Sequence, residues 1–121
     1  MTNVAAFTGP LIAADETILG ATVRNPAGET LGTVDDLMID SATGRIVYAV
    51  MSFGGLLGLG AQYFPVPWDL VTQDAANDAF VVNLDKARLE TAPRYETETE
   101  WTRRYASEID SFYGVNRPPP T

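Results

Sequence analysis

LGTVDDLMIDSATGRIVYAVMSF, residues 31–53, contains the strongest β-strand pattern in the chain. Its last part, Arg45 to Phe53, is apolar at both sets of alternating positions and rich in β-branched and aromatic side chains. Such a run is typical of a strand covered on both faces, so we expect it in the interior of a sheet. The residues before it, Ser41 to Gly44, have turn composition and predict a hairpin with the segment from Leu31 to Asp40.

The first strand of this hairpin changes face in its middle. Val34 belongs to one set of alternating positions, whereas Leu37 and Ile39 belong to the other, with Asp35 and Asp36 between them. One extra residue at the aspartate pair would bring these apolar side chains to the same face. The pattern therefore predicts a β-bulge there.

Shorter β segments flank the hairpin on both sides. They are Thr22 to Arg24, followed by the turn Asn25-Pro26-Ala27-Gly28; AQYFPV at residues 61–66; Val71-Thr72; and Ala79 to Leu84. Pro65 and Pro67 cannot donate to a ladder, so the segment that contains them should lie at a sheet edge. About six short strands separated by turns predict a mainly β fold, a small antiparallel barrel or sandwich.

The hydrophobic period changes after Asp85, which is a candidate N-cap for a short helix that ends before Pro93. Thr97 and Glu100 form a capping-box pattern for a second helix. Four large apolar side chains follow at helical spacing, and Gly114 supplies a stop: Trp101, Tyr105, Ile109 and Phe112. This stripe could pack on the chain's own barrel or on a second subunit.

These patterns divide the chain into four parts. We expect an N-terminal arm at residues 1–10, a barrel at 11–95, a C-terminal amphipathic helix at 96–114 and a proline-rich tail at 115–121. A chain of 121 residues is long enough for one compact domain and too short for a second full one.

The composition excludes several classes of function. A net charge of −8 repels phosphate backbones and anionic lipid heads, so we expect neither nucleic acid nor direct membrane insertion. The chain has no Cys and no His, which excludes thiolate nucleophiles, imidazole relays and His- or Cys-ligated metals. The N-terminal residues have no basic side chain and no long apolar run, so we expect a cytoplasmic protein.

The glycine-rich stretch FGGLLGLG, residues 53–60, could be a phosphate-binding loop, a membrane-touching loop or a hairpin tip. It lacks the lysine of a P-loop and the third glycine of a dinucleotide fingerprint, and a strand rather than a helix follows it. We therefore expect a hairpin tip and no nucleotide cofactor. Asp35, Asp36 and Asp40 could in principle hold a divalent cation, but on a strand they point apart, so we expect no metal either.

Several motifs occur in a recognisable order. They are GATV at residues 20–23, GETLG at 28–32, Asp40 before the SATG turn, GRIVYAV at 44–50, the FGGLLGLG loop, and PVPW at 65–68. In this order and spacing the chain closely resembles the PRC-barrel family, named for the cytoplasmic domain of the photosynthetic reaction-centre H subunit, and its stand-alone bacterial subgroup. The resemblance implies a small, strongly bent β-barrel that serves as a binding or adaptor module, with no catalytic residues and no cofactor.

We therefore expect a non-enzymatic protein that binds itself, as a homodimer, and an unidentified protein partner. The alternative is an accessory or regulatory protein of a photosynthetic or other electron-transport complex. The candidate interface residues are the large apolar side chains of the glycine-rich loop, its flanks and the last helix: Phe53, Leu56, Leu57, Leu59, Tyr63, Trp68, Trp101, Tyr105, Ile109 and Phe112.

Overall fold

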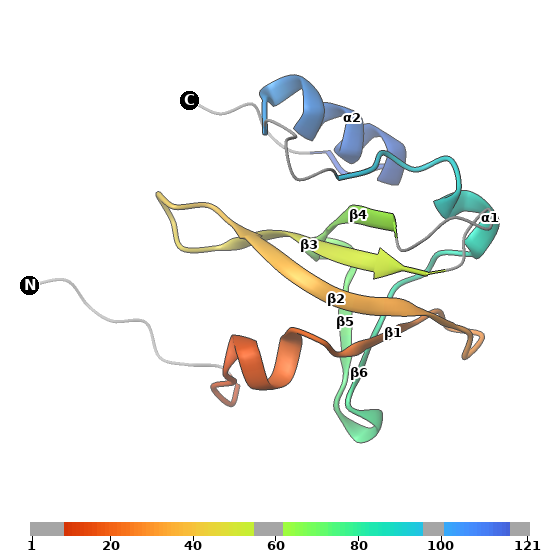
Figure 1. Cartoon of the computed structure of the whole chain (residues 1–121). Helices are drawn as coiled ribbons and strands as arrows, with labels where there is room; N and C mark the ends of the chain where they lie inside the picture. Colours follow the sequence, from red (N-terminus) through yellow and green to blue (C-terminus); the bar gives the residue numbers. More distant parts are fainter. Residues whose placement is uncertain (1–8, 55–61, 96–100, 117–121) are drawn as a thin grey trace, which may run out of the picture.

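The computed structural model describes residues 9–54, 62–95 and 101–116 (Figure 1). The fold is mainly β, as predicted, with six strands in one sheet of order β4-β3-β2-β1-β6-β5. The strands are β1 (Thr22–Arg24), β2 (Thr30–Ile39), β3 (Ile46–Phe53), β4 (Gln62–Pro67), β5 (Thr72–Asp74) and β6 (Ala79–Val81). The helical segments are η1 (Ala14–Ile18), η3 (Trp68–Leu70), η4 (Ala75–Asn77), α1 (Lys86–Leu89) and α2 (Arg103–Tyr113).

The predicted hairpin of β2 and β3 is confirmed, including its bulge. The register between the two strands shifts between Val34 and Asp36, so that Val34 lies opposite Met51 and Leu37 opposite Ala49. Both Val34 and Leu37 therefore pack against the core. The turn that joins the strands is closed by a hydrogen bond from the Gly44 amide to the Asp40 carbonyl, and Gly44 has a φ of +77°. Glycine accepts this left-handed conformation without strain.

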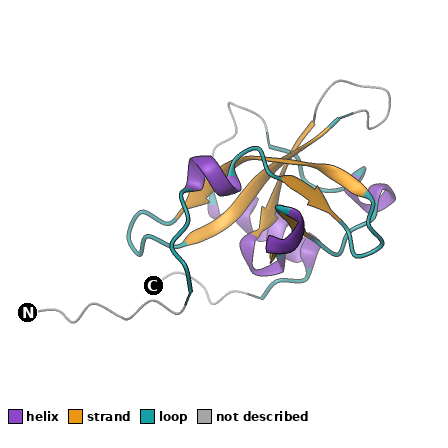
Figure 2. Cartoon of the chain, turned by 90° about the horizontal axis from the view of Figure 1, so that it is seen from below, coloured by secondary structure: helices purple, strands orange, loops and turns teal. Residues whose placement is uncertain are grey.

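The sheet is mixed, which corrects the expectation that every pairing is antiparallel. Residues 22–24 of β1 pair with residues 79–81 of β6 in parallel, whereas the other neighbours are antiparallel. The chain reaches β6 only after it has passed through β4, η3 and β5, and it then runs alongside β1 in the same direction. In Figure 1, β5 and β6 cross steeply beneath β2 and β3, and Figure 2 shows the same bent sheet from below.

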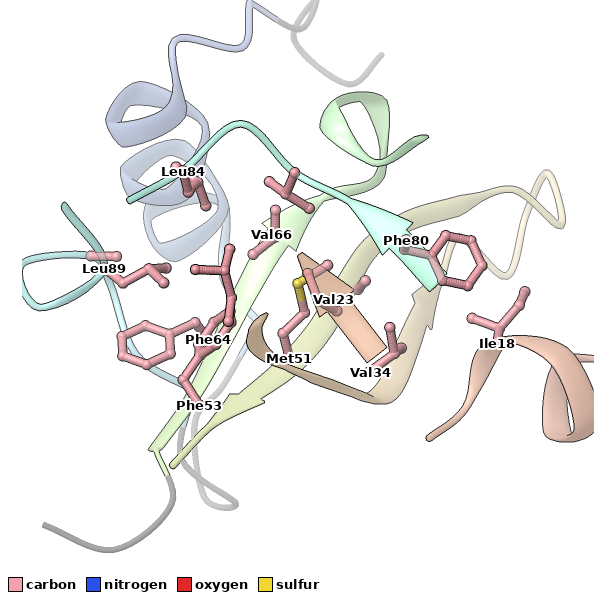
Figure 3. Packing of buried hydrophobic residues seen from close by; sticks show 14 residues of the cluster. Ile18, Val23, Val34, Met51, Phe53, Phe64, Val66, Phe80, Leu84 and Leu89 are labelled. Carbon is pink, nitrogen blue, oxygen red and sulfur yellow. The ribbon is translucent and has the colours of Figure 1, made fainter. Parts of the chain in front are cut away.

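The core fills the concave side of the bent sheet (Figure 3). Its largest fully buried side chains on the strands are Phe53, Phe64 and Met51, and the rings of Phe53 and Phe64 lie 5.3 Å apart. Leu89 of α1 closes one end of this core. Ile18 of η1, a segment that the sequence patterns did not predict, belongs to the same cluster. The core therefore contains side chains from η1 and α1 as well as from the strands.

The positions of the two C-terminal helices agree with the sequence in part. Asp85 caps α1 as predicted, because its carboxylate accepts a hydrogen bond of 2.8 Å from the Arg88 amide. Helix α2 begins at Arg103, with Thr102 as its N-cap, and ends at Gly114, which is left-handed as expected. Trp101 therefore precedes the helix, and the predicted capping box of Thr97 and Glu100 falls outside the described residues. None of the described helices combines the length and apolar content needed to cross a bilayer.

Candidate protein-interaction surface

Four aromatic rings join the start of α2 to the outer face of the sheet. The Trp101 ring lies 5.2 Å from that of Tyr48 on β3, 5.7 Å from that of Tyr95, and 5.0 Å from that of Tyr105 on α2. Tyr48 itself is buried, since only 4% of its surface is exposed. Trp101 and Tyr105, both predicted interface residues, therefore make contacts within the chain.

Hydrogen bonds attach α2 to the rest of the chain at several points along the helix. The Tyr48 hydroxyl donates to Asp110 Oδ1 at 2.9 Å, and the Tyr105 hydroxyl donates to the Arg94 carbonyl at 2.8 Å. At the other end, the Arg88 guanidinium donates to the Phe112 carbonyl and lies 4.4 Å from the centre of the Phe112 ring. Between these ends, Ile109 is fully buried. Of the two alternatives left open for the apolar stripe, the structure places it on the chain's own barrel (Figure 1).

The remaining candidate residues are divided between core and surface. Phe53 is buried in the core, and Trp68 is half-buried with its ring 5.9 Å from that of Phe80. Tyr63, on the edge strand β4, is 39% exposed, and its carbonyl accepts a hydrogen bond from the Tyr95 amide. The three leucines of the glycine-rich loop, Leu56, Leu57 and Leu59, lie outside the described residues.

One surface was not predicted from the sequence: the far half of the β2–β3 hairpin, which we call the β2 arm (residues 35–46). Strand β2 pairs with β3 up to Ile39, but it pairs with β1 only up to Thr33. In the described parts of the chain, no strand pairs with β2 on the β1 side beyond this point. Ile39, near the end of the arm, is 57% exposed. The signal in the sequence was the unequal length of the two predicted strands, ten residues against three.

The barrel and the C-terminal segments differ in charge. Residues 1–85 contain ten acidic and two basic side chains, whereas residues 86–121 contain six of each. The whole net charge of −8 therefore belongs to residues 1–85, which include all six strands. On the β2 arm, Asp35, Asp36 and Asp40 are exposed, and Arg45 is its one basic residue.

Two cavities are lined by residues outside the β2 arm, and neither is lined by three or more carboxylates. A cavity of about 670 Å³ between α2 and residues 91–93 is lined by Arg104, Glu108 and two serines, and Arg104 already pairs with Glu108 at 3.4 Å. The other, about 400 Å³, separates η1 from β5 and β6 and contains Glu16 and Asp78. Among residues 9–54, 62–95 and 101–116, no group of three or more carboxylates is placed to hold a metal ion.

The Tyr113 hydroxyl has a pKa that clearly departs from that of an ordinary tyrosine. Burial raises the pKa of the Tyr113 hydroxyl above its usual range, and the nearby Arg88 opposes this shift only in part. The Tyr113 oxygen is buried and has no hydrogen-bond partner in the described part of the chain. A phenol that holds its proton this firmly at the end of α2 is a structural group rather than an acid or base at neutral pH.

Comparisons with known proteins identify the family. A search of curated proteins finds no match. The family model of the PRC-barrel domain matches residues 12–89, which include all six strands and α1. This span is more than half of the chain and agrees with the bent six-stranded sheet. The chain therefore belongs to the PRC-barrel family, as its motifs predicted.

Proposed function

We propose that this PRC-barrel protein is a non-enzymatic adaptor that binds another protein through the β2 arm and associates with itself through the glycine-rich loop. Domains of this family are small, often take part in protein interactions and are generally non-catalytic. The observation that carries the proposal is the unpaired side of β2 beside the exposed Ile39.

An unpaired strand edge is a ready template for another chain, and proteins usually cover it. Here β4 at one end of the sheet has two prolines, and its Tyr63 carbonyl is bonded to the Tyr95 amide. The outer face of β3 and β4 is closed by α2. The β2 arm has neither kind of cover in the described structure, so it is the part of the barrel best suited to contact another protein.

Self-association rests on different residues. Because α2 packs on its own barrel, its apolar stripe no longer requires a second subunit. Of the predicted interface residues, those left for a two-fold interface are Leu56, Leu57 and Leu59, together with the exposed Tyr63 at the start of β4. A two-fold dimer is the commonest form of self-association, and the leucines of one tip would pack against those of its partner.

Light scattering on the full chain tests self-association. We expect a dimer at micromolar concentration and a monomer for the triple variant Leu56→Ser/Leu57→Ser/Leu59→Ser. Leu70→Ser is the matched control, because Leu70 is 37% exposed on η3, outside the loop, and this variant should remain a dimer. A full chain that stays monomeric at micromolar concentration would contradict the proposed self-association.

Affinity capture from the native cell tests binding to another protein. A partner that the wild-type chain retains should be lost with Ile39→Asp and kept with Leu11→Asp, since Leu11 is also exposed but lies outside the arm. Equal retention by both variants would mean that the arm does not bind the partner.

A further inference from the structure

We infer that the unpaired edge of β2 at residues 35–39 accepts an extended segment of a partner protein as an added strand, and that this segment carries lysine or arginine side chains. The inference rests on the proposed function and names the chemistry of the partner. Three features carry it: the direction of the backbone groups, the pairing of the arm with β3, and its charge.

The backbone of β2 directs hydrogen-bonding groups toward the open edge. The Val34 amide donates to the Ala21 carbonyl at 3.0 Å, and the Val34 carbonyl accepts from the Gly20 amide at 2.7 Å. In a strand, the direction of these groups alternates in step with the side chains. Leu37 faces the core as Val34 does, because of the bulge between them, so its amide and carbonyl point toward the same edge. No segment of the described chain continues the pairing there.

A carboxylate already lies at this position. Asp36 Oδ1 accepts a hydrogen bond of 2.8 Å from the Leu37 amide. The edge therefore presents a backbone carbonyl and an acidic side chain side by side. An incoming strand that brings both a peptide N–H and a cationic side chain would satisfy the two together.

The arm is a preformed template, because β3 holds it in register on its other side from Thr33 to Ile39. The five residues from 35 to 39 span about 16 Å, at about 3.3 Å per residue, which suits a short added strand. Ile39, 57% exposed, offers an apolar contact at the end of this span. Binding to such a template does not require the protein to pay for ordering the arm.

The charge of the arm selects the partner. Asp35, Asp36 and Asp40 are exposed along it, and Asp15 and Glu16 are exposed on η1, which lies on the same side of the molecule in Figures 1 and 2. Pairing of two such edges would bring the aspartates of both copies together, and like charges on neighbouring strands are destabilising. Charge and bulge are devices that prevent edge-to-edge association of identical copies. A basic strand is attracted by the same charges.

The test uses the full chain and three blocked seven-residue peptides. One alternates lysine and valine, the second alternates glutamate and valine, and the third is the lysine peptide with alternate backbone amides methylated. Nuclear magnetic resonance titration should show the lysine peptide shifting the amide signals of residues 35–39. We expect the other two peptides to bind at least tenfold more weakly, because the glutamate peptide carries the opposite charge and the methylated peptide lacks backbone donors.

Matched variants locate the site. Asp35→Asn/Asp36→Asn should weaken binding of the lysine peptide at least tenfold. Asp78→Asn/Glu90→Gln removes the same charge from exposed positions outside the arm and should change binding less than threefold. Equal binding of the methylated peptide, equal weakening by both double variants, or no shift at residues 35–39 at millimolar peptide would each overturn the inference. Capture of a cellular partner that depends on Ile39 but not on Asp35 and Asp36 would keep the proposed function and overturn this inference alone.

Discussion

Replacement of Trp101 by alanine should detach α2 from the barrel. The indole contacts three tyrosine rings, those of Tyr48 on β3, Tyr95 before the helix and Tyr105 within it, at centroid distances of 5.0–5.7 Å. It is thus the side chain through which the sheet, the preceding segment and the helix meet. Its loss would leave a gap between α2 and the buried Tyr48.

The size of the effect follows from these contacts. An aromatic pair contributes about 0.5–1.5 kcal/mol beyond the area that it buries, so three pairs contribute about 1.5–4.5 kcal/mol. Truncation of a fully buried tryptophan to alanine costs about 3–5 kcal/mol. Because Trp101 is half-buried, we expect a loss of about 2–4 kcal/mol in the free energy of unfolding. For a chain of this length the melting temperature should fall by about 10 °C.

Urea and thermal unfolding, followed by circular dichroism and by the fluorescence of the remaining Trp68, measure this loss. Trp101→Phe is the matched control. It keeps a ring against the tyrosines and removes an indole N–H that is buried without a partner in the described residues, so it should lose less than half as much stability. A melting temperature and urea midpoint unchanged in Trp101→Ala would refute the reasoning, because α2 would then not depend on this contact.

Three further predictions concern the backbone, a buried hydroxyl and the helix. Gly32→Ala should destabilise the fold by about 3 kcal/mol or more in urea unfolding, because a Cβ there would lie 2.0 Å from the Ser52 carbonyl oxygen, whereas Gly54→Ala, with nothing within 4 Å, should be tolerated. Tyr113→Phe should raise the free energy of unfolding by about 1 kcal/mol at pH 7, since the hydroxyl is buried without a partner; an equal or lower value would contradict this. The folded state holds the Tyr113 proton more tightly than the unfolded chain, so wild-type stability should fall as pH rises above about 10, and that fall should be smaller in the variant. A chain that ends at Tyr95 should expose Tyr48 and Val50, bind hydrophobic dyes and aggregate; a stable truncated monomer would show that α2 is dispensable.

The hairpin of β2 and β3 could be predicted in detail because its signals are local. The alternation of apolar residues, the aspartate pair and the SATG turn lie within one stretch, and each specifies the backbone of its own neighbourhood. The same holds for α1, whose cap is the side chain of Asp85. The bulge is confirmed by the shift in register between Val34 and Asp36. It is needed because Val34 and Leu37 belong to different sets of alternating positions and yet both pack against the core.

The structural features that were not predicted depend on contacts between residues far apart in the sequence. The parallel pairing of β1 with β6 joins residues 22–24 to residues 79–81, and no local pattern encodes its direction. The start of α2 was predicted from Thr97, whereas the observed N-cap is Thr102, whose side chain accepts a hydrogen bond from the Tyr105 amide. The apolar stripe of α2 fitted the barrel and a second subunit equally well by period alone. The open edge of β2 became visible only from the register, which places Thr22, the first residue of β1, opposite Thr33.

The parallel pair also has a consequence for the order in which the protein folds. The meander of β2, β3 and β4 is made of contacts between neighbouring segments, which form early because the loops they close are short. The pairing of β1 with β6 closes a loop that contains most of the barrel, so we expect it to form last. Hydrogen exchange should then find the weakest protection at β1, β5 and β6, and the strongest at β3. The barrel would open at its seam, between its first and last strands, while the hairpin that carries the β2 arm remains folded.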